Sequence, residues 1–332
     1  MKNIYFVFAL LTMASYAHTP LNGHPCHHYE IYASALFWEA DEEGVDFVFS
    51  NDQGTGSITE GHLKQLSPKW NCGYRIGVAG DVACYNVETD LAWTHFSSHT
   101  HKGAAAPANG ALYSIWTSPS ASITSPTSGR GDWDLCLDTI LMDLYNPCFS
   151  CGCVEIAPHL GVIIAFISQD LNLNFSGGVS SGSVTEVLDD EIRMSNDYWG
   201  LGIRPGISGR WQWNDCLGIY ANGAFSIVGG SFHVKQSESV LFDISDTPVE
   251  ILDIDDRMYR TTILAELGLG IYWETEVLRC RPVSFQLGWE QLYFFGQNQL
   301  KRFTNASAPG IYLPISGDLS LQGITLKGSV LF

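Results

Sequence analysis

The feature that most restricts the fold of this chain is a repeated alternation of apolar residues with polar residues or glycine. In residues 70–78, WNCGYRIGV, the apolar side chains fall on one face of an extended chain, and Asn, Gly and Arg fall on the other. Successive side chains of a β-strand point to opposite faces, so this stretch predicts a strand with one apolar face. An aromatic-bearing row opposite a glycine-rich row is typical of a strand with lipid outside and a narrow, wet space inside. We therefore expect Ile76 to face lipid and Arg75 to face the lumen.

The same alternation recurs along the chain as far as its last residue. The clearest segments are residues 70–78, 85–94, 133–141, 199–211, 263–274 and 283–293. A further alternating segment ends the chain at residues 319–332, and residues 29–40, 153–168 and 217–229 complete a set of ten. These last three carry apolar side chains on both faces, so they are assigned mainly from the spacing of the others. Splitting or joining segments gives a range of about 8–14 strands, within the sizes known for such barrels.

Composition decides between a membrane protein and a soluble one. The chain is 45% hydrophobic, 12% aromatic and only 16% charged, and it has 33 glycines. Its longest apolar segment, residues 160–167, is far too short for a membrane-spanning helix. An exported chain of this composition without a spanning helix has one membrane solution, the closed β-barrel. A secreted pair of soluble β-sandwiches is the alternative.

The first residues predict export. Met1, Lys2 and Asn3 precede an apolar run at residues 4–11, and residues 15–17 form a small-x-small cleavage pattern. This order is that of a secretory signal peptide. We predict a signal peptide at residues 1–17, a periplasmic segment at 18–28 and a transmembrane β-barrel at 29–332.

The connections between the predicted strands alternate strictly between short and long. Short ones fall at residues 80–83, 146–152, 214–215 and 275–279, and long ones at 41–66, 97–131, 170–196, 231–257 and 296–317. This rhythm predicts an all-β, antiparallel up-and-down barrel of about ten strands in the outer membrane of a Gram-negative-type bacterium. Short periplasmic turns and long extracellular loops place both termini in the periplasm.

Aromatic residues support the same interpretation. Tryptophans near strand ends predict a lipid-facing girdle at the headgroup level. The girdle candidates are Trp70, Trp93, Trp133, Trp199, Trp211, Trp273 and Trp289. The last strand ends in Phe332, and a terminal aromatic residue is what the barrel assembly machinery favours. We therefore expect outer-membrane lipid and that machinery as partners.

Seven short stretches, spread from about residue 29 to the C-terminus, resemble the pore-forming major outer membrane protein family of Legionella type, which also occurs in environmental relatives of the chlamydiae. They are residues 32–45 (YASALFWEADEEGV), 69–77 (KWNCGYRIG), 90–96 (DLAWTHF), 157–161 (APHLG), 198–206 (YWGLGIRPG), 288–298 (GWEQLYFFGQN) and 319–325 (LSLQGIT). The resemblance implies a porin-like outer-membrane barrel and supplies no catalytic residue.

Function is expected to depend on charged residues of the inner face. The predicted pore-lining residues are Arg75, Glu88, Asp90, Asp134, Asp138, Arg204, Arg210, Glu266, Glu290 and Lys327. Opposite signs across a lumen imply either a water-filled path or a closed ion-pair plug. We predict a porin-like channel for passive diffusion of small hydrophilic solutes or ions. The alternative is a plugged structural or surface-contact barrel that supports a disulfide-linked envelope.

Net charge sets the expected selectivity and excludes some partners. The formal charge is −18, with acidic runs at residues 41–43, 189–191 and 243–256. Such a chain is poorly suited to nucleic acid or anionic lipid, and acidic loops favour cations at a pore mouth.

Cysteines raise the question of cross-linking. The nine cysteines are an odd number in an oxidising compartment, which leaves disulfide-linked or homo-oligomeric partners open. Cys148, Cys151 and Cys153 are the disulfide candidates; a zinc site there would lack an evident fourth ligand. The resemblance adds an analogy with chlamydial envelope proteins, in which disulfides stiffen the wall.

Catalytic and metal sites have little support from the sequence. His24, His27 and His28 beside Cys26 are expected to belong to a polar N-terminal segment. No nucleophile-elbow, zincin or phosphate-loop motif occurs. We therefore predict neither enzymatic activity, nor a cofactor, nor a metal.

Overall fold

The computed structural model describes residues 29–51, 61–82, 87–116, 123–146, 149–180, 185–278, 281–303 and 311–332. The predicted signal peptide and the segment 18–28 lie outside these residues. No helix of the described residues is long and apolar enough to cross a membrane.

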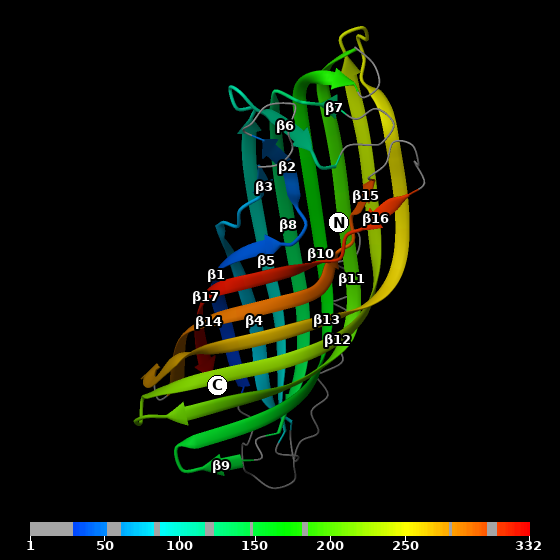
Figure 1. Ribbon diagram of the computed structural model, residues 1–332. Helices are drawn as coiled ribbons and strands as arrows, with labels where there is room; N and C mark the ends of the chain where they lie inside the picture. The colour runs from blue at the N-terminus through cyan, green and yellow to red at the C-terminus, as the bar shows by residue number, and fades with distance from the viewer. Residues whose placement is uncertain are drawn as a thin grey trace.

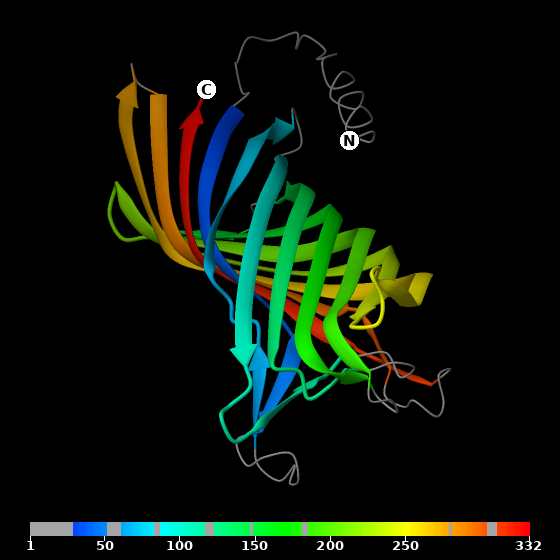
Figure 2. The same cartoon turned by 90° about the horizontal axis from the view of Figure 1, so that it is seen from above.

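Ten antiparallel strands close into a barrel (Figure 1). In chain order they are β1 (Tyr29–Glu42), β4 (Trp70–Val82), β5 (Val87–Ala105), β8 (Ser128–Tyr145), β10 (Val154–Ser180), β11 (Glu186–Gln212), β12 (Leu217–Phe242), β13 (Val249–Leu278), β14 (Arg281–Asn298) and β17 (Gly317–Leu331). Each pairs with its neighbour in the chain, and β17 returns to pair with β1, as Figure 2 shows for the red and blue strands. The predicted ten-stranded up-and-down barrel is confirmed.

Short strands lie at the two ends of the barrel. At the end of the long connections, β2 (Asp46–Asn51), β3 (His62–Gln65) and β6 (Ala111–Ser114) form a separate three-stranded sheet. The remaining short strands are β7 (Ile123–Thr124), β9 (Phe149–Cys151), β15 (Lys301–Phe303) and β16 (Tyr312–Pro314). Figure 1 places β9 at the end of the barrel opposite to β2, β6 and β7.

Several strands are much longer than the sequence pattern predicts. β10 and β11 have 27 residues each, and β13 has 30. A tilted transmembrane strand needs only about 9–11 residues. Most of the predicted loops at residues 170–196 and 231–257 is therefore strand, because the barrel wall continues beyond the bilayer.

The polarity of the two barrel faces inverts along the strands. On β10 the outward residues are apolar and mostly exposed as far as Phe166, and then become polar, as at Asp170 and Asn174. The inward residues change in the opposite sense, from His159 to the fully buried Phe175. We call the part with an apolar outside the belt half, and the part with a polar outside the loop half. The belt half is built for lipid, whereas the loop half has the polarity of a water-soluble barrel.

This inversion corrects the predicted orientation of residues 133–141 on β8. Trp133, Leu135 and Leu137 point inward and are buried, so Asp134 and Asp138 face outward. Residues 132–138 belong to the loop half, where the apolar row faces the core. Alternation alone is the same in both halves, so it does not show which of the two rows faces the lumen.

An apolar core fills the lumen of the loop half. Strand side chains such as Phe175, Phe232 and Phe294 contribute to it. Phe47 and Trp116, from the segments around β2 and β6, pack into the same core, and the Trp116 indole N–H donates to the Asp46 carbonyl at 2.6 Å. Among the described residues, the side chains of this core pack together across the lumen of the loop half.

A buried carboxyl group in the loop half gives a pH prediction. Asp190 on β11 is fully buried and its carboxylate oxygens have no hydrogen-bond partner among the described residues. Burial, with a smaller contribution from Asp189, raises the pKa of Asp190 to about 7. The folded chain therefore retains a proton that the unfolded chain releases, so stability falls as pH rises from about 4 to about 7.

We expect Asp190→Asn to stabilise the barrel by about 1–2 kcal/mol at pH values above this range, and to flatten the pH dependence of unfolding. Urea unfolding at mildly acidic and mildly alkaline pH measures both effects. The control is Asp253→Asn on the exposed outer wall of β13. Equal responses of the two variants would contradict the assignment.

Candidate functional site: a charged chamber in the belt half

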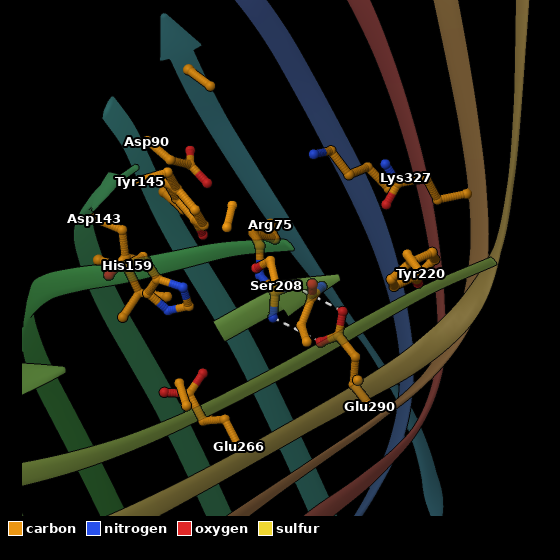
Figure 3. A pocket seen from close by; sticks show the side chains of 18 of the residues that line it. Arg75, Asp90, Asp143, Tyr145, His159, Ser208, Tyr220, Glu266, Glu290 and Lys327 are labelled. Carbon is orange, nitrogen blue, oxygen red and sulfur yellow. Dashed lines mark hydrogen bonds and ion pairs between the residues drawn. The ribbon is translucent and has the colours of Figure 1, made fainter. Parts of the chain in front are cut away.

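A polar chamber occupies the lumen of the belt half. Its volume is about 290 Å³, and most strands of the barrel contribute lining side chains (Figure 3). Its ionisable lining residues are Glu30, Tyr32, Arg75, Glu88, Asp90, Asp143, Tyr145, Glu155, His159, Arg204, Arg210, Tyr220, Glu266, Glu290 and Lys327. The apolar faces of the same strands point outward, so the charged groups are concentrated in the lumen, which the barrel wall separates from lipid.

One ion pair spans the lumen between β4 and β14. Both terminal guanidinium nitrogens of Arg75, Nη1 and Nη2, donate to Glu290, at 3.0 and 2.9 Å, in the forked geometry that makes such pairs strong (Figure 3). Arg75 Nε also donates to Thr94 Oγ1 at 2.9 Å, and the guanidinium carbon lies 5.8 Å from the centre of the Trp38 ring. The predicted lumen-facing arginine is thus held by three partners from other strands.

A second cluster centres on Arg204 of β11. It donates two hydrogen bonds to Glu266, at 2.8 and 2.9 Å, and a third to Asp143. The side chains of Arg204, Asp143 and Glu266 are only 11%, 4% and 16% exposed. Their charges are largely removed from water, so each depends on the others for stabilisation.

Weaker contacts lie elsewhere on the chamber wall. Lys327 is 3.5 Å from Glu30 and lies over the Tyr32 ring. The Tyr32 hydroxyl donates to the Asp90 carboxylate at 2.8 Å. Steric room for this ring comes from Gly77 on β4, because a Cβ there would lie 2.3 Å from the Tyr32 ring. The glycines of residues 70–78 therefore make space for bulky inward side chains from neighbouring strands.

Trp38 separates the chamber from the apolar core. It is fully buried, packs against Phe96 with ring centres 5.7 Å apart, and donates its indole N–H to Thr325 on the chamber wall. On one side of Trp38 the lumen is lined mainly by ionisable groups, and on the other side it is filled mainly by the apolar core.

The structure brings most of the predicted lumen residues together. Eight of the ten line the chamber: Arg75, Glu88, Asp90, Arg204, Arg210, Glu266, Glu290 and Lys327. Asp134 and Asp138 lie on the outer face of β8 instead. Sequence reasoning missed three carboxyl groups of the chamber, those of Glu30, Asp143 and Glu155. Continuing the corrected inward row of β8 past Leu141 would have found Asp143.

Six of the seven girdle candidates point outward. Their exposed fractions lie between 38% and 54%: Trp70, Trp93, Trp199, Trp211, Trp273 and Trp289. Trp133 does not belong to a girdle, because it is 3% exposed and its indole N–H donates to Gln169 inside the barrel. It belongs to the loop half, where aromatic residues fill the core.

The structure describes the side chain of only one of the three predicted disulfide cysteines. Cys153 is a free, exposed thiol, Cys148 lies outside the described residues, and the Cys151 side chain is not described. Disulfide formation at this turn therefore stays a prediction.

The chain is similar to one protein family and to several solved structures. The family described as "Legionella pneumophila major outer membrane protein precursor" matches residues 23–332. The outer membrane protease OmpT from Escherichia coli aligns with a TM-score of 0.40 at 8% identity, covering 95% of this chain and 99% of that one. A FadL homologue of Pseudomonas aeruginosa aligns with a TM-score of 0.35 at 8% identity, covering 93% and 90%. No curated protein sequence matches significantly. At these identities and TM-scores, neither structure's activity is transferred to this chain.

Proposed function

Since the chain belongs to the family of the Legionella pneumophila major outer membrane protein, whose match covers residues 23–332, we propose that it is an outer-membrane channel for small hydrophilic solutes and ions. The chamber is its polar vestibule. The closed loop half, with Trp38 at the boundary, is the barrier that must rearrange for a solute to pass.

The observation that carries this proposal is the gathering of charges of both signs around a chamber at membrane height. Charged groups in a lumen are costly unless they are solvated or paired. A wall that served only to fill space could do so mainly with apolar residues, as the core of the loop half does in the same barrel. Charged rings along a lumen are the usual means by which a pore selects ions.

Cation preference follows from the charges of the chamber. Seven carboxylates and four Lys or Arg side chains line it among the described residues. Lining carboxylates in excess lower the free energy of a cation relative to that of an anion. We therefore propose a channel that leans toward cations.

Single-channel recording from the refolded chain in planar bilayers tests the proposal. We expect salt-dependent steps with cation preference, and a cation-to-anion permeability ratio that moves toward unity in Glu88→Gln/Glu155→Gln. Both residues line the chamber and are exposed to water, so their neutralisation should leave folding intact.

The matched control is Asp170→Asn/Asp253→Asn, which removes the same number of charges from the outer wall. An equal change of selectivity in both double variants would mean that overall charge, and not the chamber, sets ion preference. Absence of conductance from heat-modifiable barrels, in oxidised and reduced samples alike, would reject the channel.

A specific observation favours a second candidate, a plugged structural or surface-contact barrel. The apolar core closes the loop half, and Arg75 and Arg204 are already bound by carboxylates. Silence in the bilayer experiment, together with disulfide-linked multimers on non-reducing gels, would support this candidate.

A further inference from the structure

The outer wall of the barrel carries a ladder of histidine and carboxylate pairs just beyond the apolar belt. On β5, the outward residues after Trp93 are His95, Ser97, His99 and His101. The antiparallel register places them directly opposite Asp138, Cys136, Asp134 and Asp132 of β8, in that order. Directly opposed side chains on one face of a sheet have Cβ atoms about 5 Å apart, so these groups share one surface.

We infer that His95, Cys136 and Asp138 form a binding site for a transition-metal dication of the zinc class. His95 Nδ1 lies 3.0 Å from Asp138 Oδ1, and Cys136 Sγ lies 3.9 Å from Asp138 Oδ2. One ligand atom from each residue lies within 4.8 Å of the other two. Ligand atoms around tetrahedral Zn²⁺ are about 3.3–3.8 Å apart given its bond lengths, so small side-chain rotations bring the three into place.

The donor set selects the metal. Imidazole, thiolate and carboxylate together are the ligands of zinc and its neighbours in the first transition row, whereas Mg²⁺ and Ca²⁺ require oxygen ligands. Three protein ligands leave one tetrahedral position open for water or for a group from another molecule.

The surroundings orient the carboxylate. The indole N–H of Trp93 donates to Asp138 Oδ1 at 3.0 Å, and partners of this kind position metal ligands and increase affinity. Trp93 also belongs to the outward aromatic girdle, so the site lies at the border of the belt, on the polar side.

The thiol needed for this site is free. Cys136 forms no disulfide in the structure. Cys72, the other described cysteine on this side of the barrel, lies on β4 with β5 between the two. Two strand spacings separate Cα atoms by about 9.5 Å, which exceeds the span of a disulfide, so these thiols cannot pair within one chain.

The second cluster of the ladder is less suitable. His99, His101 and Asp132 also have ligand atoms within 4.8 Å of one another. However, both carboxylate oxygens of Asp132 accept hydrogen bonds from Arg130, at 2.8 and 2.9 Å. A guanidinium on the carboxylate repels an incoming dication and occupies its lone pairs, so this cluster provides the matched control.

Cobalt(II) titration of the reduced, refolded chain in detergent tests the site, because thiolate-bound Co²⁺ gives a charge-transfer band in the near ultraviolet. We expect a saturable band with the wild type that Zn²⁺ displaces stoichiometrically. Cys136→Ser should abolish it, and His95→Gln or Asp138→Asn should weaken binding by about tenfold or more. Cys72→Ser and His101→Gln should bind as the wild type does.

Gel heat-modifiability verifies the barrel for every variant. If Cys136→Ser fails to assemble, the His95→Gln and Asp138→Asn titrations decide. A band that survives unchanged in assembled Cys136→Ser, or in assembled His95→Gln and Asp138→Asn, would overturn the proposal, because the metal would then be bound by other cysteines of the chain.

Discussion

Replacing Arg204 with methionine is expected to destabilise the barrel by about 3–5 kcal/mol, the cost of removing one partner from a buried ion pair. The substitution keeps much of the side-chain volume but leaves Glu266 and Asp143 facing each other without a cation. Both carboxylates are mostly buried, so water compensates little. Urea unfolding in lipid vesicles, followed by tryptophan fluorescence, measures the effect.

Arg204→Lys and the triple variant Arg204→Met/Glu266→Gln/Asp143→Asn complete this experiment. Lysine keeps the charge but lacks the fork that binds Glu266, so its effect should be smaller. Neutralising both carboxylates should recover a large part of the lost stability. A loss below about 1 kcal/mol for Arg204→Met would show that the cluster behaves as a solvated surface pair. The chamber would then be wetter than its geometry indicates.

Placing a charge on the lipid face is the second large perturbation. Ile76 lies near the middle of the outward row of β4, is 47% exposed in the barrel, and is flanked by Ala33 and Trp93 on the neighbouring strands. Arginine at this depth should cost about 2–4 kcal/mol. We expect Ile76→Arg to fold with low yield in bilayers and to unfold at lower urea concentration.

The matched control is Asn172→Arg, on the outward face of β10 in the loop half. The two variants add the same charge to the same side of the wall, but only one of them places it in lipid. We expect Asn172→Arg to change stability by no more than about 0.5 kcal/mol. Equal effects would contradict the division into belt half and loop half.

Of these two experiments, only the Arg204 substitution bears on the choice between the channel and the plugged barrel. Both candidates require the belt half to contact lipid, so Ile76→Arg tests the shared architecture. Arg204→Met tests how strongly the chamber is held closed by its own ion pairs. A small effect favours a wet lumen, and a large effect means that opening must keep or replace these pairs.

The sequence by itself determined the all-β class and the closed, alternating topology, and it placed the number of strands at about ten within a range of about 8–14. Period-two alternation, the absence of a long apolar run and the rhythm of short and long connections suffice for these conclusions. The sequence also identified eight of the chamber residues, because Arg75, Glu290 and the others lie on strands whose alternating part crosses the belt.

Only the tertiary structure decided which side of each alternating row faces the lumen, and how far each strand extends. A strand with lipid outside and a strand with water outside and an apolar core inside have the same period-two alternation. Which of these environments a face meets depends on its height in the barrel. For this reason residues 133–138 were assigned to the wrong face. The structure placed Trp133 in the core and moved Asp134 and Asp138 to the outer wall, opposite the histidines of β5.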